Sequence, residues 1–331
     1  MSLTPLDITM NKLIFTCENE LKHFGCCDAS GSVVLFDTNY LVVANDEDNI
    51  LRVYDVKSAG QPIESIDIAN YFNNNKKSRE VDIEGATILN GKIYWIASHG
   101  RNKKAKERPE RHNFFANQFA VNGENISAQQ IGQSYSNLLA DMLQDERLKK
   151  YQLEKAETLA PKAEGALNIE GLCATPDNRL LIGFRNPIHD GKALVIPLLN
   201  PEELIEQKDI SARFGNPYEL DLGGLGIRSI EYWEPHQLYI IAAGSYTTSE
   251  EFKFYQWSGN ADEKPELVEI VDLPFGFRPE AVVIYPNLEN KFQLLSDDGS
   301  VKRDGDIVCK DLPADSDRKF FRSVWVNVQI V

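Results

Sequence analysis

The chain has 331 residues, of which 42% are apolar, and this is enough to bury a large core in one domain or two. Its net charge of −15 argues against a general nucleic-acid binder, which would carry a basic surface. No run approaches the roughly 18 apolar residues that a membrane-spanning helix needs, and no secretory signal is visible at the N-terminus. We therefore expect a soluble protein whose partners include neither nucleic acid nor a membrane.

The cysteines are few and scattered: Cys17, Cys26, Cys27, Cys173 and Cys309. No two of them have the C-x-x-C spacing, so we expect neither a zinc site nor a disulfide framework. The simplest interpretation is a reducing compartment. We predict a cytoplasmic protein, unless a native leader is missing from the sequence.

Short apolar runs follow one another from the N-terminus, each bounded by Asn, Asp or Gly, as in strands joined by hairpins. The first group comprises KLIFTC, SVVLF, YLVVAN, ILRVYDV and ESIDIA, and the second comprises GATIL, KIYWIAS and NFFANQFAV. Inside the second group, the loop Arg101–His112 holds six Lys or Arg residues against two Glu. This loop either clamps a phosphate or carboxylate through its arginines or is simply a solvated hairpin.

Residues 136–157 interrupt the strands. They place Leu138, Leu139, Met142 and Leu143 on one helical face and contain neither Gly nor Pro. We predict an inserted amphipathic helix near 136–157 that covers one face of the β structure. The third group then supplies LLIGF, ALVIPL and YELDL, with a short helix before YELDL that is signalled by Asn200-Pro201.

The remaining runs form two more groups. The fourth holds SIEYW, QLYIIAAG, FKFYQW and ELVEIVDL, and the fifth holds AVVIYP, FQLLSD, DIVCKDL and SVWVNVQIV. Four-stranded sheets repeated around an axis make a β-propeller. We predict an all-β fold, a single β-propeller domain over residues 1–331, with five blades by our count and six left open. We expect the N-terminal KLIFTC strand to complete the last blade and close the ring.

A repeated element supports this architecture. The runs DIEGATILNGKIYWIASHGR and NIEGLCATPDNRLLIGFRNP share a carboxylate beside a glycine, a polar turn, a short apolar strand and a polar end. A unit that recurs in this way is typical of repeat folds. The carboxylates that open the copies are Glu84, Glu170, Glu231 and Glu280, with Asp28 as a degenerate fifth.

In a propeller the first strand of each blade lines the central channel, so these carboxylates should meet near one channel mouth. Close pairs repel by about 4 kcal/mol at an effective dielectric constant of about 20. Two kinds of partner could neutralise them: a divalent cation such as Ca²⁺ or Mg²⁺, or arginines in an all-protein ring. The arginine candidates are Arg101, Arg185, Arg228 and Arg278.

Short polar residues end the second strand of each group and should point toward one face. They are Asn45-Asp46, Ser98-His99, Arg185-Asn186, Gly244-Ser245 and Asp297-Asp298. Their oxygens either bind a ligand or serve the turns themselves. His99 is our candidate general acid or base, and the alternative is a hydrogen-bonded structural histidine.

The E-G runs and the segment S-H-G-R-N-K resemble an uncharacterised bacterial family known as a domain of unknown function, over nearly the whole chain. That resemblance implies a propeller fold. More distantly, the E-G repeats are similar to phytase-like esterase and gluconolactonase-type propellers, which place a divalent metal, often Ca²⁺, on channel-facing acids. Glu84 and Glu170 match this element.

These observations lead to one hypothesis and one alternative. The hypothesis is a propeller that binds a small anionic ligand at its channel mouth through a divalent cation and, if it is an enzyme, hydrolyses a phosphoester, ester or lactone. The alternative is a non-catalytic protein-interaction scaffold whose Glu/Arg ring is structural. No nucleotide or redox cofactor is expected, since there is no P-loop and Gly223-Gly224-Leu225-Gly226 lacks the third glycine of a dinucleotide-binding motif. The G-x-S-x-G and H-E-x-x-H motifs are also absent.

The hypothesis assigns each candidate residue a role. Glu84, Glu170, Glu231 and Glu280 would hold the metal, Arg101, Arg185, Asn186, Arg228 and Arg278 would bind the ligand, and His99 would move a proton, with Glu84 and Glu170 completing the catalytic set.

Overall fold

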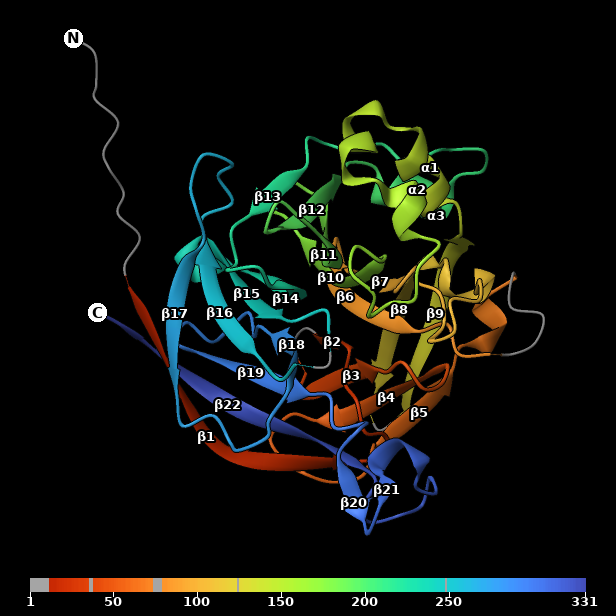
Figure 1. Ribbon diagram of the computed structural model, residues 1–331. Coiled ribbons are helices and arrows are strands. Elements are labelled where there is room, and N and C mark those ends of the chain that lie inside the picture. Colours follow the sequence, from red (N-terminus) through yellow and green to blue (C-terminus); the bar gives the residue numbers. More distant parts are fainter. Residues whose placement is uncertain (1–11, 36–37, 74–78, 124, 248) are drawn as a thin grey trace.

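The computed structural model of the protein describes residues 12–35, 38–73, 79–123, 125–247 and 249–331. Its strands form four-stranded antiparallel sheets set around a central axis, which is a β-propeller (Figure 1). The predicted fold class is therefore confirmed. Among the described residues, no helix is long and apolar enough to cross a membrane.

Each sheet is an antiparallel array built largely from consecutive strands, with the first strand innermost. The first sheet holds β2 (Gly31–Val34), β3 (Tyr40–Ala44), β4 (Ile50–Asp55) and β5 (Glu64–Asp67), and the second holds β6 (Ile83–Leu89), β7 (Lys92–Ala97), β8 (Phe114–Asn122) and β9 (Asn125–Tyr135). The third holds β10 (Asn168–Ala174), β11 (Leu180–His189), β12 (Lys192–Leu198) and β13 (Tyr218–Leu220), and the fourth holds β14 (Gly226–Trp233), β15 (Leu238–Gly244), β16 (Phe252–Trp257) and β17 (Glu266–Val271).

The last sheet joins the two ends of the chain. It holds β18 (Pro279–Val283), β19 (Lys291–Ser296), β22 (Phe320–Ile330) and β1 (Leu13–Phe24). β1 runs antiparallel to β22, with Leu13 opposite Ile330, and also pairs in parallel with β17 of the preceding sheet. The predicted closure of the ring by the N-terminal strand is confirmed, and it covers sheet edges that would otherwise be exposed.

One predicted strand of the last sheet is wrong. The run DIVCKDL lies outside the sheet, where β20 (Lys302–Asp304) and β21 (Ile307–Val308) form a two-stranded hairpin followed by a 3₁₀ turn at Cys309–Asp311. The reason is topological, because β22 takes the position next to β19 and β1 fills the outer one.

The predicted helical insertion near 136–157 is confirmed, but it is not one continuous helix. It consists of α1 (Leu138–Gln144), a 3₁₀ segment at Glu146–Tyr151 and α2 (Leu153–Ala156). The helix breaks at Asp145, where the backbone is extended, and at Gln152, which is left-handed with φ of 51°. Figure 1 shows α1 and α2 at one side of the ring with α3 (Pro201–Glu206), and the apolar face predicted for the insertion packs into the core there.

The glycines of the E-G elements let neighbouring inner strands approach closely. A Cβ at Gly85 would lie 3.0 Å from Leu172 Cβ, and one at Gly171 would lie 2.9 Å from Ile227 Cγ2. Tightly packed interiors leave no room for added atoms without displacement. The glycine of the repeat is therefore explained by packing between sheets.

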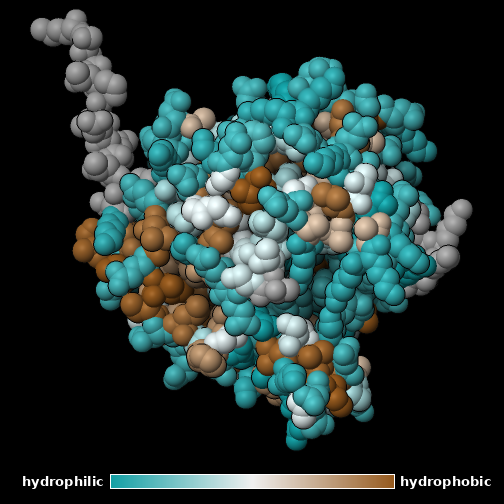
Figure 2. Space-filling view, in the orientation of Figure 1, coloured by the Kyte–Doolittle hydropathy of each residue, from teal (hydrophilic) through white to brown (hydrophobic). Residues whose placement is uncertain are grey.

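Hydrophilic side chains cover most of the face in Figure 2, and hydrophobic ones gather on the side formed by β1, β17 and β22. Leu267 of β17 and Ile330 of β22 are exposed large apolar residues of those strands.

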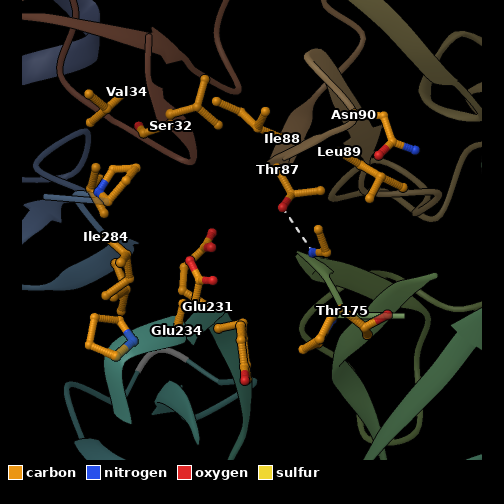
Figure 3. Close-up of a pocket in the computed structure, with 18 of the residues that line it drawn as sticks. Ser32, Val34, Thr87, Ile88, Leu89, Asn90, Thr175, Glu231, Glu234 and Ile284 are labelled. Atoms are coloured by element: carbon orange, nitrogen blue, oxygen red, sulfur yellow. Dashed lines mark hydrogen bonds between the residues drawn. The ribbon is translucent and has the colours of Figure 1, made fainter. Parts of the chain in front are cut away.

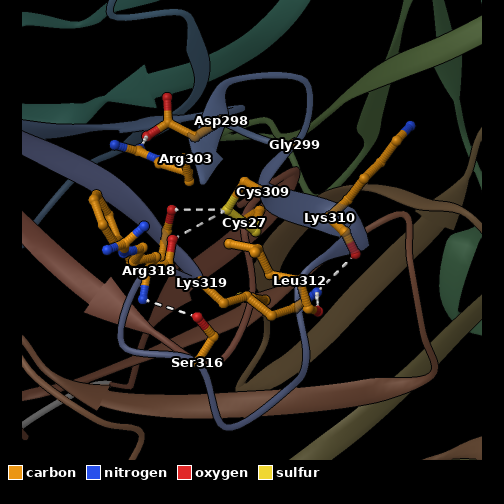
Figure 4. The surroundings of a disulfide bond; sticks show 12 residues. Cys27, Asp298, Gly299, Arg303, Cys309, Lys310, Leu312, Ser316, Arg318 and Lys319 are labelled. Carbon is orange, nitrogen blue, oxygen red and sulfur yellow. Dashed lines mark hydrogen bonds and ion pairs between the residues drawn. A yellow bond between two sulfur atoms is a disulfide. The ribbon is translucent and has the colours of Figure 1, made fainter. Parts of the chain in front are cut away.

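Cys27 and Cys309 form a disulfide, contrary to the expectation from the sequence (Figure 4). The two residues are 282 positions apart and meet because the ring brings the start of the first sheet beside the β20–β21 segment. The other cysteines, Cys17, Cys26 and Cys173, are free and buried.

We expect reduction of this disulfide to lower the free energy of unfolding by about 2–4 kcal/mol, because the cross-link restricts a long loop of the unfolded chain. Urea unfolding with and without reductant measures the change. A double variant, Cys27→Ala with Cys309→Ala, should not respond to reductant. Equal stability of the reduced and oxidised wild-type protein would contradict the prediction.

Candidate functional site

Bulges at the start of the inner strands create the site. In β6, Ile83 pairs with Ala97 and Gly85 with Ile96, so that Glu84 between them is an extra residue. A β-bulge of this kind redirects the side chain of the extra residue. The same irregularity occurs in three further inner strands, at Glu170, Arg228 and Glu280.

The prediction that Glu231 belongs to this ring of acids is wrong. The position equivalent to Glu84 in the fourth sheet is Arg228, and Glu231 lies three residues farther along β14. The feature that the bulged strands share is a small residue after the bulge, which is Ser229 in β14 and Gly85 in β6. Aligning the repeats on their glutamates concealed this register.

Arg228 joins three sheets through one nitrogen. Its Nη1 donates to Glu170 Oε2 over 3.0 Å and to Glu280 Oε1 over 2.9 Å. Arg185 Nη1 donates to Glu170 Oε1 over 2.8 Å, and Asn168 Nδ2 donates to the same oxygen over 2.6 Å. The arginine partners predicted for the acids are thus present at Arg185 and Arg228.

Three carboxylates converge beside these arginines. Glu84, Glu170 and Glu280 each offer an oxygen, and the three oxygens lie within 4.8 Å of one another. Oε2 of Glu280 is buried and has no hydrogen-bond partner within the described part of the chain. A buried acceptor without a partner is costly, so this atom points to a missing donor or cation.

The pKa values of the three carboxyl groups are shifted in different directions. Although burial alone would raise it, the pKa of Glu170 is held below its ordinary value by Arg185 and Arg228. Burial raises the pKa of Glu280 to about 8 in spite of Arg228. Burial, Asp82 and Glu170 together raise the pKa of Glu84 well above its ordinary value.

Further acids surround this cluster. Burial and the neighbouring carboxylates of Asp46 and Asp297 raise the pKa of Asp28. Asp82 accepts from Arg111 Nη1 over 2.7 Å, and its charge contributes to the raised pKa of Glu84. Asp28, Asp46 and Asp297 therefore lie close enough to one another for their charges to interact.

Two predicted site residues are engaged elsewhere. Arg101 Nε donates to the carbonyl of Glu157 over 2.5 Å and so supports the helical insertion. Arg278 pairs with Glu250 and Ser300 at the surface. We therefore do not assign the ligand to either arginine.

Asp298 is also taken up by structure. It is buried, accepts from Arg303 Nη2 over 2.7 Å, and pairs with Arg322 through both oxygens. Asn186 donates from Nδ2 to the carbonyl of Ala163 over 2.8 Å, whereas its buried Oδ1 has no partner in the described residues.

His99 is buried and its ring stacks on His112. Its Nδ1 lies 2.8 Å from the carbonyl oxygen of Ala97. Burial and the nearby His112 lower the pKa of His99 to about 3. A histidine with this pKa stays neutral near pH 7, as the structural alternative for His99 requires.

Three lysines near the site, Lys103, Lys162 and Lys310, were not predicted individually. Burial and the nearby charges of Arg185 and Arg228 lower the pKa of Lys162, which places this lysine of the segment after α2 near the ring. The positive charge of Lys310 lowers the pKa of Lys103. No spacing in the sequence relates these lysines, because they come from loops of different sheets.

The chain is a β-propeller, and residues 30–124 and 115–303 match the family described as "Protein of unknown function (DUF3616)". The chain belongs to this family, in agreement with the resemblance found in the sequence. None of the curated proteins matches it.

Solved structures of similar fold include three enzymes. Myxococcus xanthus glutaminyl cyclase has a TM-score of 0.51 and 10% identity, over 98% of this chain and 100% of that one. A GH43 β-1,3-galactosidase gives 0.48 and 11%, over 91% of each chain. The PQQ-bound aldose sugar dehydrogenase of Streptomyces coelicolor gives 0.47 and 10%, over 96% and 99%. Identities this low show the fold alone.

Glu280 should make stability depend on pH. Its pKa is about 8 in the folded protein against an ordinary 4.5, so the carboxyl ionises more readily in the unfolded chain. The contribution of Glu280 to the free energy of unfolding therefore falls as the pH rises from 4.5 to 8. Urea unfolding between pH 5 and pH 8 should therefore show a decline that is shallower in Glu280→Gln, by up to roughly 1.4 kcal/mol per pH unit. Parallel profiles for the two proteins would contradict the prediction.

Proposed function

We propose that the protein binds a divalent cation at its channel mouth, through Glu84, Glu170 and Glu280, and that a small anionic ligand binds there with it. The observation that carries the proposal is Oε2 of Glu280, a buried acceptor without a described partner beside two further carboxylates. Clustered carboxylate oxygens suit Ca²⁺ and Mg²⁺. A cation there would also offset the repulsion that Glu84 experiences from Asp82 and Glu170.

The surrounding residues have roles in this proposal. Arg185 and Arg228 fix the carboxylate of Glu170 through hydrogen bonds, as residues behind a metal ligand commonly do. Lys162 and the paired Lys103 and Lys310 supply positive charge for an anion at the mouth.

If the ligand is a substrate, we propose hydrolysis of a phosphoester, ester or lactone. A bound cation supplies Lewis-acid polarisation and lowers the pKa of bound water. His99 is not retained as the proposed proton acceptor, because its pKa of about 3 makes it a weak base.

Cation binding should raise the thermal unfolding temperature. A cation at about 100 times its dissociation constant adds about 2.7 kcal/mol, which is a rise of several degrees for a chain of this size. Glu280→Gln and Glu84→Gln should remove the effect of Ca²⁺ or Mg²⁺, and Glu231→Gln, whose carboxylate lies outside the ring, should keep it. No effect of either cation, with no metal in the purified protein, would overturn the proposal.

A specific observation favours a second candidate, the interaction scaffold. Arg228 Nη1 already bridges Glu170 and Glu280 from two other sheets, so the ring can lock the sheets together without a metal. In this reading the protein presents its surface to a protein partner and the ring is structural.

Substitution of Arg228 measures how much the ring contributes to the stability of the fold. Arg228→Met should lower the free energy of unfolding by about 3–5 kcal/mol, because it leaves the buried Glu280 without its ion partner and Glu170 with Arg185 as its ion partner. The control Arg278→Met removes a surface ion pair and should cost no more than about 1 kcal/mol. Similar costs for the two variants, measured by urea unfolding, would refute the locking role.

We also propose a cellular location for the protein. The scattered cysteines alone predict the cytoplasm. The Cys27–Cys309 disulfide favours an oxidising compartment instead, because such bonds are rare in the cytosol.

A further inference from the structure

The channel has a second opening at the opposite ends of the inner strands. There a cavity of about 490 Å³ is lined by the last residues of these strands and the turns after them. Small-molecule sites commonly have volumes of about 300–1,000 Å³. The cavity is therefore large enough to enclose a small organic ligand.

The cavity is separate from the ring of acids. Between the two lies a void of about 10 Å³, lined by Glu84 and Glu170 at one side and by Ser32 and Glu231 at the other. A void of this size holds about one water molecule. A ligand in the cavity would thus be kept apart from the ring.

Glu231 and Glu234 are the acidic residues of this part of the channel. The positions equivalent to Glu231 in the other bulged strands are Thr87, Cys173 and Val283, and none of these is charged at neutral pH. No described residue forms a hydrogen bond or ion pair with the Glu231 carboxylate, and burial raises its pKa well above the ordinary value. Figure 3 shows Glu231 and Glu234 directed toward the space across from Ile88.

Ser32 provides an independent sign of a ligand. Ser32 is 5% exposed and lines the cavity. Its Oγ is buried and has no hydrogen-bond partner among the described residues. By contrast, the hydroxyl of Thr87 in the same cavity accepts a hydrogen bond from the backbone of Ala174. The hydroxyl of Ser32 is therefore free to form a hydrogen bond with a ligand.

The charge and polarity of the other lining residues indicate which class of ligand fits the cavity. None of the described residues around the cavity is Lys, Arg or His, whereas Glu231 and Glu234 are both acidic. The wall is otherwise largely apolar and includes Val34, Leu89 and Ile284. A cation with an apolar body complements such a site, and an anion would meet uncompensated carboxylates.

We propose that this cavity binds a small organic ammonium ion, with its amine paired to Glu231, its second hydrogen bond made to Ser32 Oγ, and its hydrocarbon body against the apolar wall. The site is distinct from the channel mouth discussed above and takes a ligand of the opposite charge. Either site can therefore be occupied, or fail its test, independently of the other.

Three probes of one shape test the charge preference by isothermal titration calorimetry: cyclohexylmethylamine, cyclohexylmethanol and cyclohexanecarboxylate. The wild-type protein should bind the amine most tightly and the carboxylate most weakly. This comparison needs no variant. Equal or tighter binding of the carboxylate, or no binding of any probe at millimolar concentration, would overturn the proposal.

Substitution then tests the residue. Glu231→Gln should weaken binding of the amine on the order of tenfold, because a charged hydrogen bond becomes neutral, and should change binding of the alcohol less than about twofold. The control is Glu154→Gln at an exposed position of α2, which should bind all probes as the wild type does. Unchanged binding of the amine by a folded Glu231→Gln protein would exclude Glu231 as its partner.

Discussion

Arg228 donates from one nitrogen to carboxylates of two other sheets, and the centre of the propeller depends on this contact. Taking charged groups out of water is costly, and a buried pair recovers that cost only when its geometry satisfies both partners. The bulges supply the geometry, because each turns its extra residue toward the axis at the same level of the ring. One arginine among three glutamates then makes the convergence of acids tolerable and leaves one oxygen of Glu280 without a described partner.

The architecture could be predicted because its cause is local and repeated. Alternating apolar runs and turn residues recur in each sheet, and two sheets carry the E-G element, whose glycine is required by the close approach of the inner strands. Glu84, Glu170, Glu280 and their partners Arg185 and Arg228 follow from the same repeat. Glu231 was wrongly assigned to the ring because the repeats were aligned on their glutamates. The determinant was the small residue after the bulge, which is serine in β14.

Features that depend on long-range proximity could not be predicted. The Cys27–Cys309 bond joins residues 282 positions apart that meet only after the ring closes. Lys162 and Lys310 reach the mouth from loops whose paths no periodicity fixes. The helix at 136–157 had a correct apolar face, but the backbone at Asp145 and Gln152 breaks it into short segments that pack on a curved surface. Local propensity gave the type of structure there and tertiary packing set its length.

The positions of Arg228 and Glu231 in β14 also explain why the two ends of the channel differ. Had the fourth inner strand carried its glutamate at the bulge, the ring would hold another acid and lack its bridging arginine. Instead the arginine occupies the bulge and the glutamate lies deeper, at a level where the equivalent residues are Thr87, Cys173 and Val283. One strand thus adds positive charge at one end of the channel and negative charge toward the other. The resulting polarity arises from the register of β14, and a ligand that enters from either end meets a different charge.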